Sequence, residues 1–233
     1  MAYVYAPDRK AARPIAHLAG FSGVLQVDGY AGYKVLAERG NVQLAFCWSH
    51  VRRHFYELAQ AGAAPIASEA LTRIAALYRG EIRGRSAEER HAVRQQRGLP
   101  LVEAFQPWLR EKLSLISQKT KLAEAIRYAL SRWAGLCLFL EDGRIEIDNN
   151  VVERAIRPIA LTRKNALFAG SDGGAEHWAV IASLIESCKL LGVEPHGYLA
   201  DVISRIVDGH AQSRLDDLLP WSYPLMPQLQ VVA

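Results

Sequence analysis

The chain has 233 residues, and 50% of them are hydrophobic, so it can bury a sizeable core without metal or disulfide staples. No apolar run is long enough to span a bilayer, and the first residues lack the basic and apolar regions of a secretory signal, which argues against a membrane or secreted protein. Three cysteines without metal-ligand spacing favour a reducing, cytoplasmic compartment, and a net charge of +4 with a pI near 9.0 favours nucleic acid only mildly.

The first 48 residues predict the order strand, helix, strand, helix, strand, which is an α/β arrangement. The alternating stretch 23–28 predicts a strand that ends at Asp28 and delivers its carboxylate to the edge of a sheet. Asp28 and Gly29 are also a hairpin signal, but the helical character of residues 33–38 argues against a hairpin. The short, apolar segment 42–48 predicts a buried strand.

Residues 50–61 then switch to helical spacing, and the pattern from about residue 65 to 140 is almost wholly helical. The run Arg79–Arg97 is dense in Arg and Glu and lacks apolar anchors, which predicts a solvated helix or loop. The apolar positions form four stripes: Val51, Phe55 and Leu58; Leu71, Ile74, Ala75 and Tyr78; Leu101, Phe105, Trp108 and Leu109; and Leu122, Ile126, Leu130, Trp133 and Leu136.

The last part of the chain predicts two more helices. One runs from about residue 174 to 191, opened by Ser171 and stopped by Gly192, and the other follows Pro195 and ends before Gly209.

A short helix-start signal between Asp148 and Pro158 carries the acid Glu153 beside two arginines, Arg154 and Arg157. A carboxylate next to cations suits a group that holds a metal ion beside a phosphate backbone. Two structural alternatives stay open, because Asn150 and Glu153 resemble a capping box and Glu153 with Arg157 has the spacing of a helical ion pair.

Cys47 and His50 have the spacing of half a zinc site. No matching second half follows in the sequence, so zinc is not expected, and Cys47 is expected to pack as a small apolar thiol.

Four segments of the chain, in this order, resemble the insertion sequence 66 family of bacterial transposases, and the resemblance covers most of the chain. They are residues 25–33 (LQVDGYAGY), 47–53 (CWSHVRR), 148–158 (DNNVVERAIRP) and 163–171 (RKNALFAGS).

The resemblance implies a ribonuclease H-like fold with an Asp-Asp-Glu triad, in which Asp28 matches the second Asp and Glu153 the Glu. The first Asp of the family pattern lies upstream of this chain, which therefore resembles the C-terminal part of a transposase. Asp8 is a poor substitute for that acid, because Pro7 and Asp8 look like a turn. The resemblance also implies a supporting role for His50 near the active site, against the alternative of a histidine satisfied at a helix start.

The expected fold class is α/β, with a partial ribonuclease H-like core interrupted by an all-helical insertion and followed by C-terminal helices. The expected domains are the first part of the core at 1–62, the helical insertion at 63–143, the second part of the core with Glu153 at 144–192, and a helical tail at 193–233.

The resemblance implies metal-dependent cleavage and transfer of DNA strands in the transposition of an insertion sequence. Two Mg²⁺ or Mn²⁺ ions about 3.5–4 Å apart can clamp such a displacement from both sides. We expect Asp28 to bridge both ions and Glu153 to bind one. Two alternatives stay open, a truncated DNA-binding remnant without catalysis and a metal-dependent nuclease of the same fold.

Three pairs of basic residues lie beside the expected active-site segments and are expected to contact DNA phosphates: Arg52 and Arg53, Arg154 and Arg157, and Arg163 and Lys164. The expected partners are transposon ends, target DNA and either further copies of the chain or a full-length transposase. The expected location is the cytoplasm, in association with the nucleoid.

Overall fold

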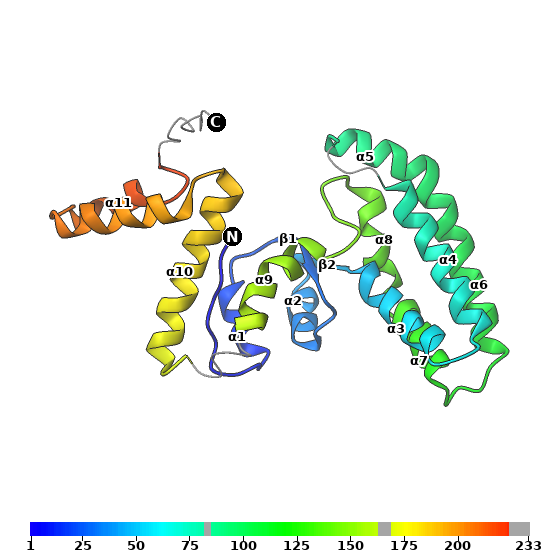
Figure 1. Cartoon of the computed structure of the whole chain (residues 1–233). Coiled ribbons are helices and arrows are strands. Elements are labelled where there is room, and N and C mark those ends of the chain that lie inside the picture. Colours follow the sequence, from blue (N-terminus) through cyan, green and yellow to red (C-terminus); the bar gives the residue numbers. More distant parts are fainter. Residues whose placement is uncertain (82–84, 163–168, 224–233) are drawn as a thin grey trace, which may run out of the picture. The chain divides into compact units, whose positions relative to one another are not determined.

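The computed structural model describes residues 1–81, 85–162 and 169–223 of the chain (Figure 1). These residues divide into two compact units. We call Lys10–Arg154 the central unit, and Met1–Arg9 together with the chain from Ala155 onward the terminal unit. None of the described helices is long and apolar enough to cross a membrane.

The central unit contains a small parallel sheet. Strand β1 (Gly23–Val27) pairs with β2 (Val42–Phe46), with Val27 opposite Phe46. The short helix α1 (Ala12–His17) precedes β1, and the chain crosses from β1 to β2 through η1 (Ala31–Tyr33) and α2 (Lys34–Glu38). The two expected strands are confirmed, although the second ends at Phe46, two residues before the expected end, because Trp48 begins a helix. The hairpin alternative is excluded because the two strands run parallel.

The strand expected at the start of the chain is wrong, because residues 1–6 form no strand. The backbone N–H of Tyr3 donates to Ser183 Oγ at 2.8 Å, so a helix side chain satisfies it in place of a neighbouring strand.

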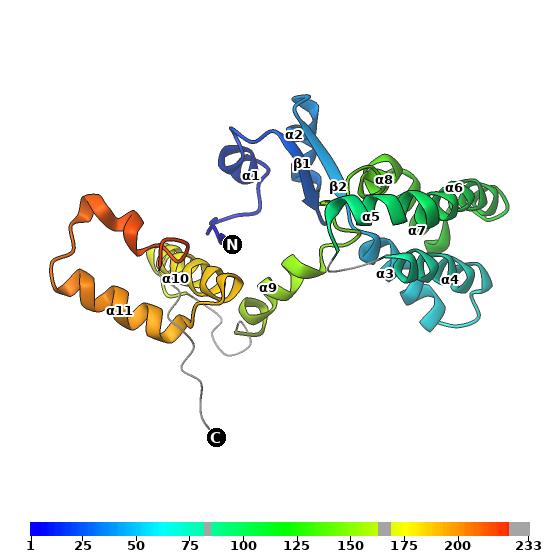
Figure 2. The ribbon, with the colours of Figure 1, turned by 90° about the horizontal axis from the view of Figure 1, so that it is seen from above.

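A layer of helices follows the sheet within the central unit (Figure 2). The helices are α3 (Trp48–Gln60), α4 (Pro65–Gly80), α5 (Ala87–Val93), η2 (Arg94–Gly98, a π-helix), α6 (Leu99–Ser114), α7 (Lys121–Leu130) and α8 (Trp133–Glu141). Trp48 is fully buried, stacks on Phe105 with ring centroids 6.2 Å apart, and donates its indole N–H to the carbonyl of Leu136 at 2.9 Å. The expected helical character of 65–140 is confirmed.

The fourth predicted stripe is interrupted. The chain leaves the helical conformation at Arg132, so α7 ends at Leu130 and α8 begins at Trp133. Both helices still bury their apolar residues in the same core, including Ile126 and Leu136. The break turns α8 towards β2, where Gly135 packs so closely that a Cβ would collide with the carbonyl of Leu44.

The prediction that Arg79–Arg97 is solvated is wrong for its most buried members. The side chains of Arg94 and Glu81 are 2% and 3% exposed and form an ion pair at 2.7 Å. One guanidinium nitrogen of Arg94 also donates to the carbonyls of Phe139, Asp142 and Ile145 at 2.8, 3.1 and 2.9 Å. A sequence pattern cannot distinguish this buried pair from surface charges, because the carbonyl groups that surround Arg94 lie in a distant part of the chain.

The terminal unit is built on α10 (Asp172–Leu191) and α11 (Pro195–Val207), followed by η3 (Gln212–Leu218). Ser171 caps α10 by accepting the N–H of Gly174 at 3.0 Å, and Gly192 ends it with φ of 72°. Both predicted helices are confirmed. A small core of its own holds this unit together, formed by Cys188, Val193, Tyr198, Val202 and Leu218.

Candidate metal-binding and catalytic site

Asp28 lies at the carboxyl end of β1, as the sequence predicts. It is exposed, and its Oδ1 accepts the backbone N–H of Tyr30 at 2.9 Å, while Gly29 between them has φ of 92°. Because β1 and β2 are parallel and Val27 lies opposite Phe46, Asp28 and Cys47 leave the sheet at the same edge.

Glu153 lies in the first turn of α9 (Asn150–Thr162). The segment before this helix is tied to the sheet, because Gln26 of β1 donates to the carbonyls of Glu146 and Asp148 at 2.8 and 3.2 Å. The N–H of Trp48 also donates to the carbonyl of Ile147 at 3.1 Å. These bonds bring the start of α9 to the end of β2.

The capping-box interpretation of Asn150 and Glu153 is wrong. The buried carboxylate of Asp148 accepts both the backbone N–H and the side-chain amide of Asn150, at 3.1 and 2.7 Å. The Glu153 carboxylate instead points towards His50 and Arg53, and its own backbone N–H donates to the carbonyl of Asn149.

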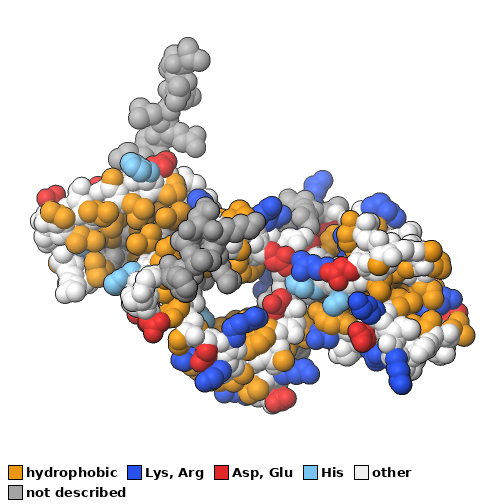
Figure 3. Space-filling view, turned by 60° about the horizontal axis from the view of Figure 1, so that its bottom comes forward, with side chains coloured by type: hydrophobic (Ala, Val, Ile, Leu, Met, Phe, Trp, Pro, Cys, Tyr) orange, Lys and Arg blue, Asp and Glu red, His pale blue; other side chains and the backbone are white. Residues whose placement is uncertain are grey.

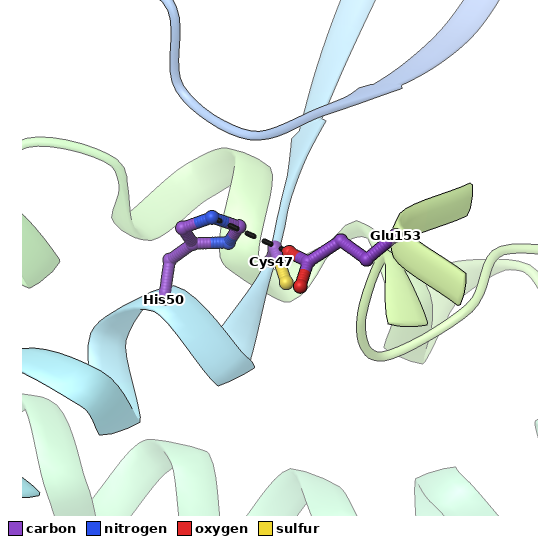
Figure 4. Close-up of side chains that lie close together, drawn as sticks. All are labelled: Cys47, His50 and Glu153. Atoms are coloured by element: carbon purple, nitrogen blue, oxygen red, sulfur yellow. Dashed lines mark ion pairs between the residues drawn. The ribbon is translucent and has the colours of Figure 1, made fainter. Parts of the chain in front are cut away.

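Cys47, His50 and Glu153 converge into a group whose ligand atoms all lie within 4.8 Å of one another (Figure 4). His50 Nε2 is 3.5 Å from Glu153 Oε1, and Arg53 Nη2 is 3.9 Å from Glu153 Oε2. Cys47 is buried, whereas the side chain of Glu153 is 39% exposed, so the group is open to solvent on the Glu153 side.

The residues of this group change one another's protonation. The interaction with the Cys47 sulfur raises the pKa of His50 above its usual 6.5, burial opposes this rise, and the charge of Glu153 adds to it. Burial alone would raise the pKa of Cys47, but the interactions with His50, Ser49 and the N–H of Asn149 lower it overall. Each of the two pKa shifts favours the charged form of its group.

Asp28 does not belong to the group of Cys47, His50 and Glu153. Tyr128 of α7 interacts with Asp28 and also with the charge of Cys47. Tyr128 Oη donates to the carbonyl of Asp28 at 3.5 Å. Burial raises the pKa of Tyr128, the charge of Arg132 lowers it, and the charges of Cys47 and Asp28 raise it. The hydroxyl therefore lies within electrostatic reach of the carboxylate and of the thiol.

The basic residues beside the site differ in their contacts. Arg52 lies over the ring of Tyr56 at 5.3 Å, Arg53 faces Glu153, and Arg154 and Arg157 are exposed on α9. On the face drawn in Figure 3, basic, acidic and histidine side chains lie next to one another. The predicted contacts Arg163 and Lys164 lie outside the described residues.

Sequence reasoning missed two features of the site. Cys47 is buried, as expected, but it also accepts a hydrogen bond from the N–H of Asn149 and faces His50 and Glu153. Tyr128 and Arg132 come from the helical layer and stack at 3.9 Å beside the Asp28 turn, where a Cβ on Gly29 would meet both side chains. The spacing of Cys47 and His50 is a signal for the contacts of Cys47. No local sequence pattern indicates that Tyr128 and Arg132 lie beside the Asp28 turn.

Comparison with known proteins finds a family. The model of the transposase IS66 family matches residues 1–177, and that of the IS66 C-terminal element matches residues 183–221. No solved structure matches the chain.

Curated relatives from Sinorhizobium fredii (strain NBRC 101917 / NGR234) carry no described activity. The uncharacterized protein y4qI is 46% identical over 96% of this chain and 43% of its own length. The uncharacterized protein y4jD is 44% identical over 95% of this chain and 45% of its own length. The chain thus spans less than half the length of these relatives.

Proposed function

Because the chain belongs to the IS66 family of transposases, we propose that it is the catalytic-core part of an enzyme that cuts and joins DNA strands in a metal-dependent reaction. The observation that carries the proposal is the placement of Glu153 next to His50, at the end of a parallel sheet that presents Asp28. We assign the sheet and the helical layer to a ribonuclease H-like core with a helical insertion, as the resemblance implies.

The donor atoms suit Mg²⁺ or Mn²⁺. Asp28 is exposed and Glu153 is partly exposed, so both carboxylates can offer hard oxygen ligands while water and phosphate complete the coordination. When bound, such ions activate the attacking oxygen and stabilise the leaving oxygen of a phosphodiester. Asp28 and Glu153 would hold them.

The neighbouring residues have positioning roles in this proposal. His50 fixes one oxygen of Glu153 at 3.5 Å, which leaves the other oxygen directed to Arg53. Arg53 is exposed and can exchange this carboxylate for a DNA phosphate. Arg52, Arg154, Arg157, Arg163 and Lys164 are the further proposed phosphate contacts, on transposon ends and target DNA.

The proposed assembly is a multimer of this chain or a complex with a full-length transposase, acting on DNA in the bacterial cytoplasm and at the nucleoid. A second hypothesis is a DNA-binding remnant without catalysis. A nuclease of the same fold would hydrolyse DNA without joining strands.

Strand joining on supercoiled plasmid distinguishes these functions. The chain would be tested alone and as a fusion to the part of y4qI that it does not match, each with Mg²⁺ or Mn²⁺. We expect the fusion to nick and join strands, and Asp28→Asn or Glu153→Gln to abolish both steps.

The control for this test is Glu103→Gln, which changes an exposed acid on α6. Joining that survives Asp28→Asn or Glu153→Gln would refute the assignment, and nicking without joining would favour the nuclease.

A further inference from the structure

Cys47, His50 and Glu153 offer three different donor atoms to one point, although they come from β2's end, α3 and α9. Figure 4 shows the side chains of His50 and Glu153 directed towards the thiol of Cys47. His50 Nδ1 is buried and has no hydrogen-bond partner among the residues that the structure describes. The imidazole is therefore not fully committed to other protein groups.

The chemistry of this donor set differs from that of an acid pair. Mg²⁺ selects hard oxygen ligands and seldom binds sulfur, whereas Zn²⁺ accepts thiolate, imidazole and carboxylate together. Three protein ligands with a fourth position open to water is an arrangement that Zn²⁺ adopts in proteins. The open side at Glu153 supplies that fourth position.

The geometry is close to what such an ion requires. Zn–N, Zn–O and Zn–S bonds of about 2.0–2.3 Å in a tetrahedron separate the ligand atoms by roughly 3.3–3.7 Å. His50 Nε2 and Glu153 Oε1 already lie 3.5 Å apart, and the whole set lies within 4.8 Å. A small rotation of the partly exposed Glu153 side chain would close the remaining gap.

The sulfur is also held in place by its surroundings. The N–H of Asn149 donates to Cys47 Sγ at 3.2 Å, and Ser49 Oγ lies 3.0 Å from the same sulfur. Hydrogen bonds to a ligand atom fix its orientation and support metal binding.

We propose that Cys47, His50 and Glu153 form a binding site for a thiophilic divalent ion such as Zn²⁺. This proposal rests on the proposed function in one respect. There Glu153 binds Mg²⁺, so an ion bound to Cys47, His50 and Glu153 competes with Mg²⁺ for the same carboxylate. An ion bound in this way withdraws the carboxylate from Mg²⁺, so occupancy of the site and metal-dependent strand joining exclude each other.

Co²⁺ titration of the metal-free chain, followed by absorption, tests the site without DNA. A cobalt–thiolate bond gives an intense near-ultraviolet band, which we expect in the wild-type chain and expect Zn²⁺, but not an excess of Mg²⁺, to remove. Cys47→Ser should abolish the band, whereas Cys137→Ser and Cys188→Ser, which change the other free cysteines, should retain it.

His50→Gln and Glu153→Gln should each weaken Co²⁺ binding at least about tenfold, because loss of a direct ligand costs no less than loss of its support. These two variants carry the test if circular dichroism shows that Cys47→Ser does not fold. A wild-type chain without the band, a band that Cys47→Ser retains, or an unchanged affinity in the other two variants would overturn the proposal. The assay reads ion binding alone, so its failure is distinct from a failure of strand joining.

Discussion

The pKa of His50 reports directly on the contacts among Cys47, His50 and Glu153. Its pKa is raised first by the Cys47 sulfur and further by Glu153, against the effect of burial. A raised histidine pKa stabilises the folded chain fully below pH 6.5, and this stabilisation is lost as the pH rises through the folded-state pKa.

We therefore predict that Cys47→Ala and Glu153→Gln each lower the pKa of His50, with the larger fall in Cys47→Ala. NMR titration of the His50 ring protons measures this, with Glu103→Gln as the control that leaves the pKa unchanged. Equal values in the wild-type chain and all three variants would show that the three side chains do not meet in solution.

At the scale of single residues, the predicted site residues His50 and Glu153 lie next to each other, and the predicted packing of Cys47 is confirmed by its burial. Asp28 and Glu153 were placed by their motifs, and the structure puts each at the end of an element where a carboxylate can act. The role of Cys47 depends on Asn149 and Glu153, which join it only through folding. Such contacts leave no local pattern in a single sequence.

At the scale of elements, the buried pair of Arg94 and Glu81 connects η2 with the end of α8, because Arg94 also binds three carbonyls there. Glu81 also pairs with Arg90 at 3.1 Å, so losing Arg94 leaves the buried acid with one of its two partners and leaves the three carbonyls without their donor.

We predict that Arg94→Met lowers the free energy of unfolding by about 3–5 kcal/mol in urea denaturation. The matched control is Arg144→Met, because Arg144 is exposed and its pair with Asp142 should contribute less than about 1 kcal/mol. If both substitutions had the same small effect, Arg94 would not be buried in solution.

The end of α10 depends on the backbone of Gly192. Its φ of 72° lies in the left-handed region, so Gly192→Ala should cost about 1–2 kcal/mol of stability. Gly173→Ala is the control, because Gly173 lies in the same helix without a positive φ and a Cβ there meets open space. Thermal unfolding of both variants measures the difference, and equal melting temperatures would contradict the helix end seen here.

The helices were largely predictable because their signals are local. Ser171, Gly192 and Pro195 mark boundaries by their own conformational preferences, and the apolar stripes repeat at helical spacing. The break at Arg132 and the burial of Arg94 were not predictable, since both depend on packing between distant segments.

At the scale of the whole molecule, the described chain forms two compact units, and Cys47, His50 and Glu153 lie within the central one. Asp28 and Glu153 belong to that unit together with the helical layer between them in the sequence. The apolar stripes predict the helices of this layer, but no sequence pattern shows that Tyr128 and Arg132 reach the Asp28 turn.

We propose that Asp28 and Glu153 bind the same metal centre. Iron-mediated cleavage of the purified chain tests whether one ion lies next to both residues. Fe²⁺ replacing Mg²⁺ generates hydroxyl radicals that cut the backbone next to the bound ion. We predict cuts near residue 28 and near residue 153, both suppressed by excess Mg²⁺ and both reduced by Asp28→Asn. Cuts near only one of these residues, or cuts that Asp28→Asn leaves unchanged, would contradict a shared metal centre.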